Sequence, residues 1–156
     1  MRITRELKQA IKKGMHADYA NVRFKLPRFP RRWPKCFATI TGFATTGEIW
    51  SATRNKRADI KLKTFLKKLG VKIYRITGYS VKNPAHAEDG WLTPLTFDDA
   101  CDIGLLFKQD AIYYIINDEL FVSYCDQRRK LIPMGSFSSR VDQNKNVKSS
   151  KRRASS

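Results

Sequence analysis

Residues 96–125 read TFDDACDIGLLFKQDAIYYIINDELFVSYC, and this stretch carries the clearest fold signals of the chain. A threonine followed by two acids at 96–99 predicts the start of a helix, because a hydroxyl can cap the first turn and the helix dipole favours acids there. Runs rich in β-branched and aromatic residues at 110–116 and 119–125 predict two strands. The Asn-Asp pair at 117–118 then predicts a two-residue hairpin turn.

The sequence before this stretch alternates between strand-like and helix-like segments. Residues 36–43 form a nearly continuous apolar and β-branched run, which predicts a buried central strand. Residues 53–69 place apolar side chains on one face and seven basic ones elsewhere, and Gly70 follows where the helix is expected to end. Further predictions are a helix capped by Thr4, strands at 22–26 and 71–77, a loop containing Asn83-Pro84 and Asp89-Gly90, and a strand at 91–95 that Pro94 favours as an edge.

These segments together predict an α+β fold. We expect a single domain with a mixed β-sheet and two packed helices, in the order β-β-α-β-β-α-β-β, because strand-like and helix-like patterns interleave. The expected division is a basic N-terminal helix at 1–19, a core at 20–126, and a basic, largely disordered tail at 127–156. Three prolines within the segment 27–35 of the core favour an extended stretch, which we call the connector.

Length and composition limit the class of protein. The chain has 156 residues and a mass of 18.1 kDa, enough for one ordinary domain. Its apolar and aromatic shares of 42% and 12% are those of a globular protein. No run approaches the ~20 apolar residues of a membrane helix, and no secretory signal is expected. Three scattered cysteines and two isolated histidines favour neither a disulfide framework nor a metal site.

The formal charge of +17 is unevenly distributed along the chain. Residues 1–35 carry +9, residues 36–69 carry +5 and residues 127–156 carry +8, whereas residues 70–126 carry −5. Such asymmetry is typical of a surface that contacts phosphates. The connector also offers aromatic rings that can stack on bases.

The candidate nucleic-acid-binding residues come from the connector, the helix at 53–69 and the tail. They are Arg28, Arg31, Arg32, Trp33, Lys35, Arg54, Lys56, Arg57, Lys61, Lys67, Lys68, Arg128, Arg129, Lys130, Lys151, Arg152 and Arg153.

Residues 37–114 resemble an uncharacterised bacterial family, the domain of unknown function 3293. The resemblance rests on Thr39-Ile40-Thr41-Gly42-Phe43, Ser51, Asn55, Gly70, Gly78, Trp91 and, above all, Phe107-Lys108-Gln109-Asp110-Ala111-Ile112. It implies that this stretch folds as one unit. It also implies a shared polar cluster made of Ser51, Asn55, Gln109 and Asp110. The chain departs from the family pattern at Ala44-Thr45, where the family favours Asn-Pro.

The sequence supports three functional hypotheses. The leading one is a small cytoplasmic accessory protein, without catalysis or cofactor, that binds nucleic acid or a nucleoprotein complex through phosphates. The second is a protein-interaction module or inhibitor, encoded for example by a phage or mobile element, whose partner is an acidic protein such as a nucleic-acid enzyme. The third is an enzyme acting on a nucleotide or nucleic acid through the polar cluster. Convergence of these side chains in a pocket would favour an enzyme, and their use in backbone hydrogen bonds would argue against it.

Overall fold

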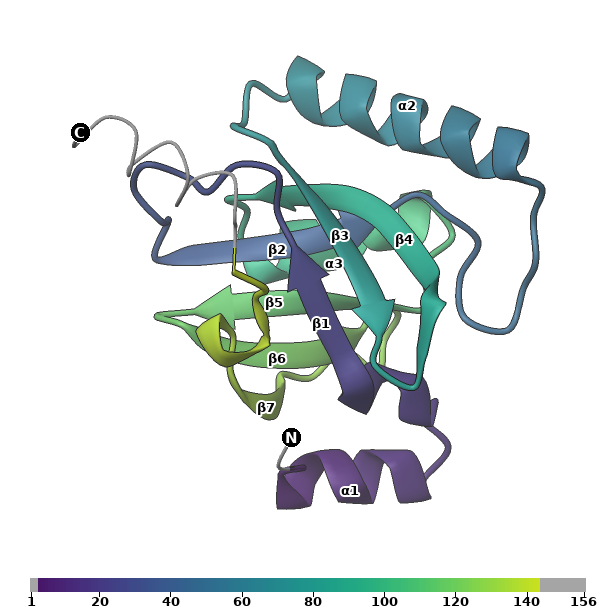
Figure 1. Cartoon of the computed structure of the whole chain (residues 1–156), viewed down its shortest axis with the longest axis vertical. Coiled ribbons are helices and arrows are strands. Elements are labelled where there is room, and N and C mark those ends of the chain that lie inside the picture. Colours follow the sequence, from purple (N-terminus) through teal and green to yellow (C-terminus); the bar gives the residue numbers. More distant parts are fainter. Residues whose placement is uncertain (1–2, 144–156) are drawn as a thin grey trace.

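The computed structural model describes residues 3–143, which form helices on both sides of one curled sheet (Figure 1). The helices are α1 (Arg5–Lys12), α2 (Ala52–Lys68) and α3 (Phe97–Leu106), with short 3₁₀ helices η1 (Ala17–Asn21) and η2 (Ser138–Arg140). The strands are β1 (Val22–Lys25), β2 (Cys36–Thr41), β3 (Tyr74–Ser80), β4 (Asn83–Thr93), β5 (Ala111–Ile116), β6 (Glu119–Tyr124) and β7 (Ile132–Ser136). The α+β class is confirmed.

The stretch 96–125 folds as its local chemistry predicts. The Thr96 hydroxyl accepts a hydrogen bond from the amide of Asp99 at 3.2 Å and caps α3. Asn117 and Asp118 both have positive φ values, 47° and 68°, as a primed hairpin turn requires between β5 and β6. The hairpin prediction is therefore confirmed.

The sheet has the strand order β1-β3-β4-β2-β5-β6-β7, and neighbouring strands are antiparallel throughout. The sheet is therefore antiparallel and not mixed as expected. Among the described residues the one parallel pairing is an isolated bridge between Phe24 and Val141. Helix α2 carries the chain from β2 to β3, which is not next to β2 in the sheet. The chain then turns back, and β4 fills the position between β3 and β2, antiparallel to both.

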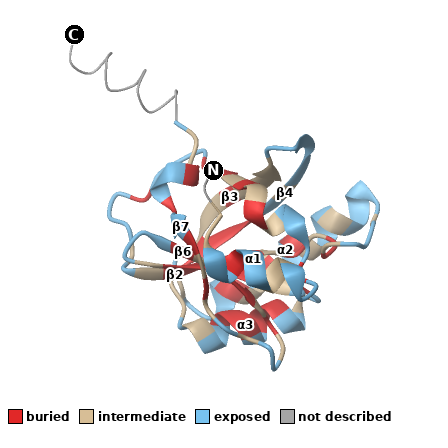
Figure 2. Ribbon diagram, turned by 90° about the horizontal axis from the view of Figure 1, so that it is seen from below, coloured by how far each residue is buried: buried red, intermediate tan, exposed pale blue. Residues whose placement is uncertain are grey.

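The two faces of the sheet bury different cores. Ala38 and Ile40 of β2 face α2 and α3, where they pack with Leu62 and Leu66 of α2. Phe37 of β2 points to the opposite, concave face, which α1, η1 and the C-terminal segment cover. This alternation follows from the two-residue period of a strand. In Figure 2 the buried residues lie in the interior of the sheet and on the inner sides of the helices, whereas the β3–β4 hairpin and the outer side of α2 are exposed.

The predicted loop with Asn83-Pro84 and Asp89-Gly90 is wrong. These residues belong to β4, which has 11 residues and lies inside the sheet between β3 and β2, so the strand at 91–95 is no edge. Pro84 is accommodated at a register irregularity, because Ser80 pairs with Asn83 but Tyr79 pairs with Ala87. Gly90 is needed where the strands approach closely, since a Cβ there would lie 2.5 Å from the Ile40 carbonyl oxygen.

The described part of the expected tail is folded. β7 pairs with β6, and α1 packs against β7 with Leu7 completely buried. Within this segment the Arg140 side chain is 1% exposed. The fold therefore continues past residue 126 to at least residue 141, where Val141 bridges to β1. Residues 144–156 lie outside the described residues.

Candidate nucleic-acid interface

The outer face of α2 carries a dense set of cations. Its exposed basic residues are Arg54, Lys56, Arg57, Lys61, Lys67 and Lys68. None of these six forms an ion pair within residues 3–143. Lys63 is half-buried, with its ammonium 5.5 Å from the Trp91 ring centre.

The only acid of α2 is turned away from this face. Asp59 is 7% exposed and receives two hydrogen bonds from the Arg75 guanidinium, at 2.9 and 2.8 Å. This pairing raises the pKa of Arg75, and the guanidinium also stacks over Trp91 at 3.8 Å. Because the carboxylate is inside and already paired, the outer face of α2 keeps its full positive charge.

Sheet register brings the connector to the same end of the molecule as the end of α2. β1 and β4 end there, and β2 and β3 begin there, as the pairs Lys25–Thr77, Ala38–Thr93 and Tyr74–Leu92 show. This end is visible at the upper left of Figure 1. It gathers exposed basic residues of the connector and around the α2–β3 turn, namely Arg28, Arg31, Arg32, Lys35, Lys67, Lys68 and Lys72. Arg54, Lys56 and Arg57 lie toward the opposite end of α2, about 15–21 Å from Lys67 and Lys68 along the helix.

The connector's rings have a structural role as well as an exposed surface. The centroid of the Trp33 ring lies 6.0 Å from Phe29 and 5.8 Å from both Phe37 and Phe137. This cluster anchors the connector to the core. Phe29 and Trp33 nevertheless remain 36% and 40% exposed, so each keeps an accessible edge or face.

The basic residues at 128–130 are placed differently from those of α2. Arg128 pairs with Asp126 at 2.8 Å, which lowers the pKa of that carboxyl. Arg129 pairs with Asp98 and Asp102 of α3 at 3.2 and 3.0 Å and thereby ties α3 to the turn after β6. Both arginine charges are therefore compensated in the free protein. Lys130 is exposed, and Lys151, Arg152 and Arg153 lie outside the described residues.

In the predicted polar cluster, the side chains of Ser51, Asn55 and Gln109 form hydrogen bonds with the backbone, and Asp110 contributes its backbone amide. Ser51 caps α2, and its hydroxyl accepts from the Arg54 amide at 3.1 Å. The other three hold residues 43–45, the loop after β2. Asn55 Oδ1 accepts from the Ala44 amide at 2.9 Å, Gln109 Nε2 donates to the Phe43 carbonyl at 2.7 Å, and the Asp110 amide donates to the Thr45 hydroxyl at 3.0 Å. The structure therefore brings Asn55, Gln109 and the Asp110 amide to one loop in a supporting role, whereas Ser51 caps α2.

Residues 40–112 match the model of a family described as "Protein of unknown function (DUF3293)". The resemblance to DUF3293 is confirmed. No curated protein and no solved structure matches the chain. The DUF3293 match begins in β2 and ends in β5, so it includes α2 and the loop that Asn55 and Gln109 hold, whereas the connector and β7 lie outside it.

Gln109 offers a direct test of the supporting role within the DUF3293 segment. The residue is 5% exposed, and its amide nitrogen donates to two carbonyls, those of Phe43 and Phe107. Gln109→Ala is expected to lower the free energy of unfolding by about 1–3 kcal/mol, because the variant leaves buried carbonyl groups unpaired. Urea denaturation measures the change. The exposed Gln127→Ala is the matched control, and equal stability of the two variants would contradict this role.

Sequence reasoning did not identify two features of this surface. Lys72, which follows Gly70, adds a cation at the connector end, and its position could have been inferred from the predicted turn after α2. The second feature is the inward, paired carboxylate of Asp59. The sequence could not show this pairing, because the partner Arg75 is on another element.

Two exclusions apply to the described residues. No helix within 3–143 is long and apolar enough to cross a membrane. In the same range, no group of three His, Cys, Asp or Glu side chains is arranged to hold a metal ion.

Proposed function

We propose that this protein binds nucleic acid, alone or within a nucleoprotein complex, through phosphate contacts and without catalysing a reaction. The observation that carries the proposal is the outer face of α2, where six exposed cations have no acidic neighbour on the helix except the inward Asp59. The proposal places the protein in the cytoplasm, with RNA or DNA as its partner.

The charge pattern of α2 has an energetic cost in the free protein. Arg57 and Lys61 are four residues apart, as are Lys63 and Lys67, so like charges face each other along the helix. Each such pair destabilises a helix by a few tenths of a kcal/mol, where an acid would stabilise it. A polyanion relieves this repulsion, and release of its counterions adds to the affinity.

The remaining features support a non-catalytic role. Three side chains of the polar cluster, those of Ser51, Asn55 and Gln109, are engaged with the backbone, which is the arrangement that argues against an enzyme. Cations on a rigid helix and connector fix the position of a phosphate chain but do not read bases, so we expect binding that depends on backbone and shape. The exposed parts of Phe29 and Trp33 add a surface for stacking on an unpaired base.

The test measures the salt dependence of binding to labelled duplex DNA and single-stranded RNA by fluorescence anisotropy. The variant Arg57→Gln/Lys61→Gln/Lys68→Gln removes three cations from one stripe of α2. We expect the slope of log K against log salt to fall by about 2 units, since each lost phosphate contact contributes about 0.7–0.9. Affinity at low salt is expected to fall about tenfold or more.

The matched control removes the same net charge elsewhere. Lys8, Lys12 and Lys13 are exposed on and after α1, which lies across the sheet from α2 (Figure 1). Lys8→Gln/Lys12→Gln/Lys13→Gln is expected to keep most of the affinity and slope. Equal losses in both triple variants would show that the affinity depends only on net charge. An affinity that does not change with salt concentration would contradict the proposal. Stoichiometric binding of a purified acidic protein, with no binding to nucleic acid, would favour the interaction-module hypothesis instead.

A further inference from the structure

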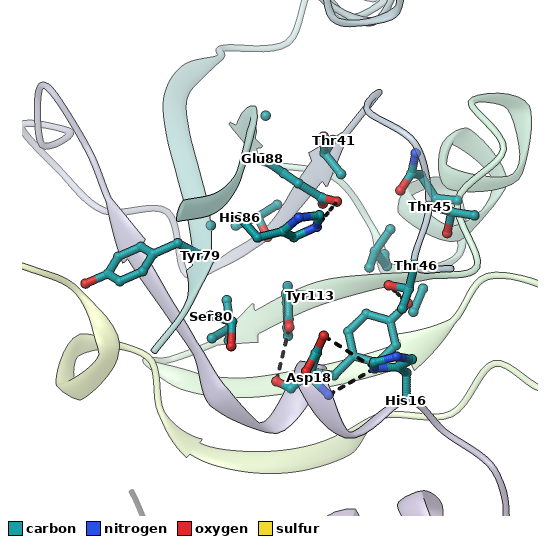
Figure 3. A pocket seen from close by; sticks show the side chains of 18 of the residues that line it. His16, Asp18, Thr41, Thr45, Thr46, Tyr79, Ser80, His86, Glu88 and Tyr113 are labelled. Atoms are coloured by element: carbon teal, nitrogen blue, oxygen red, sulfur yellow. Dashed lines mark hydrogen bonds and ion pairs between the residues drawn. The ribbon is translucent and has the colours of Figure 1, made fainter. Parts of the chain in front are cut away.

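A second candidate site lies on the concave face of the sheet, on the side away from α2. It is a cavity of about 390 Å³, within the usual range for small-ligand pockets. Its walls come from η1 and the residue before it, from the loop after β2, and from the β3–β4 hairpin. Figure 3 shows His86 and Glu88 projecting from β4 on one side of this space, with His16 and Thr46 on the other.

The floor of the cavity contains an unused hydrogen-bonding group. Thr39 of β2 is 8% exposed and lines the cavity, and its hydroxyl has no hydrogen-bond partner among residues 3–143. The space above the floor exists partly because Gly78 and Gly90 carry no side chain there. A hydroxyl that opens into the cavity from a largely buried residue is suited to a ligand with a polar end, because it can both donate and accept a hydrogen bond.

The wall opposite β4 is fixed in position. Hydrogen bonds with the side chains of Asn55 and Gln109 and with the Asp110 amide hold residues 43–45. The next residue, Thr46, donates through its hydroxyl to the Tyr19 hydroxyl at 3.1 Å and joins the loop to η1. The Tyr19 ring in turn packs edge-on against Tyr113, with centroids 6.2 Å apart. The supporting residues within the DUF3293 match therefore preorganise one side of this cavity.

The charge of the lining is opposite to that of the protein. The chain has 31 Lys and Arg residues, yet none of those within residues 3–143 lines the cavity, whereas Asp18, Glu48 and Glu88 do. Burial raises the pKa of Glu88, which also lies 3.9 Å from His86 Nε2. The remaining lining includes the rings of Tyr19 and Tyr113 and aliphatic side chains such as Ile76. Carboxylates, aromatic rings and an apolar floor together suit a cation with a hydrocarbon body.

We infer that this cavity binds a small organic cation, an alkylammonium or diamine whose hydrocarbon part lies on the apolar floor and whose ammonium group lies near Glu88. The positive charge elsewhere does not prevent this. At physiological ionic strength the Debye length is about 8 Å, so distant exposed lysines and arginines are largely screened while the carboxylates in the cavity are in contact with the ligand.

The test titrates full-length, nucleic-acid-free protein with 1,4-diaminobutane and, separately, with its neutral isostere butane-1,4-diol. Two-dimensional amide NMR follows both titrations, because Gly78, Glu88 and Gly90 report directly on the cavity. We expect saturable shifts at these amides with the diamine and none with the diol. Equal shifts with the two compounds, or no saturable shift with the diamine, would overturn the inference.

Variants locate the binding. Glu88→Gln keeps the side-chain shape and is expected to weaken diamine binding by about fivefold to tenfold, the loss of one partly exposed ion pair. Gly78→Val fills the cavity, where a Cβ meets nothing closer than 3.6 Å, and is expected to abolish binding in a folded protein. Glu119→Gln, at an exposed position outside the cavity, is the matched charge control and is expected to bind like wild type. Unchanged affinity in Glu88→Gln would refute the placement, as would binding of a lysine peptide without binding of the free diamine. These outcomes do not depend on whether α2 binds nucleic acid.

Discussion

Replacing Arg140 by alanine is expected to lower the free energy of unfolding by about 3–5 kcal/mol, the range for breaking a buried charged network. The guanidinium is buried and donates to three backbone carbonyls, those of Ala20 and Val22 at 2.9 and 3.1 Å and that of Met134 at 3.2 Å. Arg140→Ala leaves these carbonyls unpaired and opens a cavity as well. The loss is large because one side chain connects η1, β1 and β7.

Urea denaturation followed by circular dichroism measures this change. Burial lowers the pKa of Arg140, but a guanidinium stays protonated at neutral pH, so three charged hydrogen bonds are lost together. Arg140→Lys keeps a positive charge but donates its hydrogen bonds from one nitrogen only, so we expect an intermediate loss of stability. Arg31→Ala removes an exposed arginine and is expected to change stability by less than about 0.5 kcal/mol. If Arg140→Ala and Arg31→Ala were equally stable, the C-terminal segment would not hold the fold together as described.

Gly90→Ala is expected to lower the free energy of unfolding by about 3 kcal/mol, at the upper end of the usual cost of overpacking. The added Cβ would lie 2.5 Å from the Ile40 carbonyl oxygen and 3.1 Å from its carbon. Both atoms belong to the backbone of the neighbouring strand, so β2 and β4 must move apart at the centre of the sheet. Differential scanning calorimetry and urea denaturation together report the loss.

Gly78→Ala is the matched control for Gly90→Ala. Gly78 lies on the adjacent strand and also lines the concave face, but its added Cβ would meet only the side chains of Val22 and Phe24, at ordinary distances of 3.6 Å and more. We expect a change within about 0.5 kcal/mol, with a small gain possible because alanine restricts the unfolded chain. Similar costs for both substitutions would mean that glycine is needed in these strands for a reason other than close backbone approach.

The fold was predictable wherever local chemistry decides the structure. Thr96 caps α3, and Asn117-Asp118 turns the chain, because hydrogen bonds and φ preferences act over two or three residues. Residues 83–90 of β4 were missed because Pro84 and Gly90 are strand breakers in isolation, whereas the end of β4 falls within the predicted strand at 91–95. β4 tolerates Pro84 because of the register irregularity opposite β3, and it needs Gly90 because β2 lies so close. Neither feature can be deduced from the sequence of β4 alone. β7 was missed because its five residues, IPMGS, include a proline and a glycine, which an edge strand tolerates.

The candidate sites show the same division. The cations of α2 were predicted because their number and helical spacing are properties of the sequence. The compensation of Arg129 by Asp98 and Asp102 was not, because the partners are on α3, about 30 residues away in the sequence. The acidic cavity escaped prediction for a related reason. Asp18, Glu48 and Glu88 come from three separate segments and line one cavity only in the folded protein.

The sequence by itself determined the α+β class, the helices, the N-caps Thr4 and Thr96, the main hairpin and the excess of positive charge, since each depends on neighbouring residues or on composition. The resemblance of the central segment to DUF3293 was also visible there. Only the tertiary structure decided which charges remain free. It turned Asp59 inward, paired Arg129 with α3, buried Arg140 and gathered carboxylates on the concave face. The physical reason is that the free energy of a charge depends on its partners and its burial, and both are set by contacts between residues far apart in the chain.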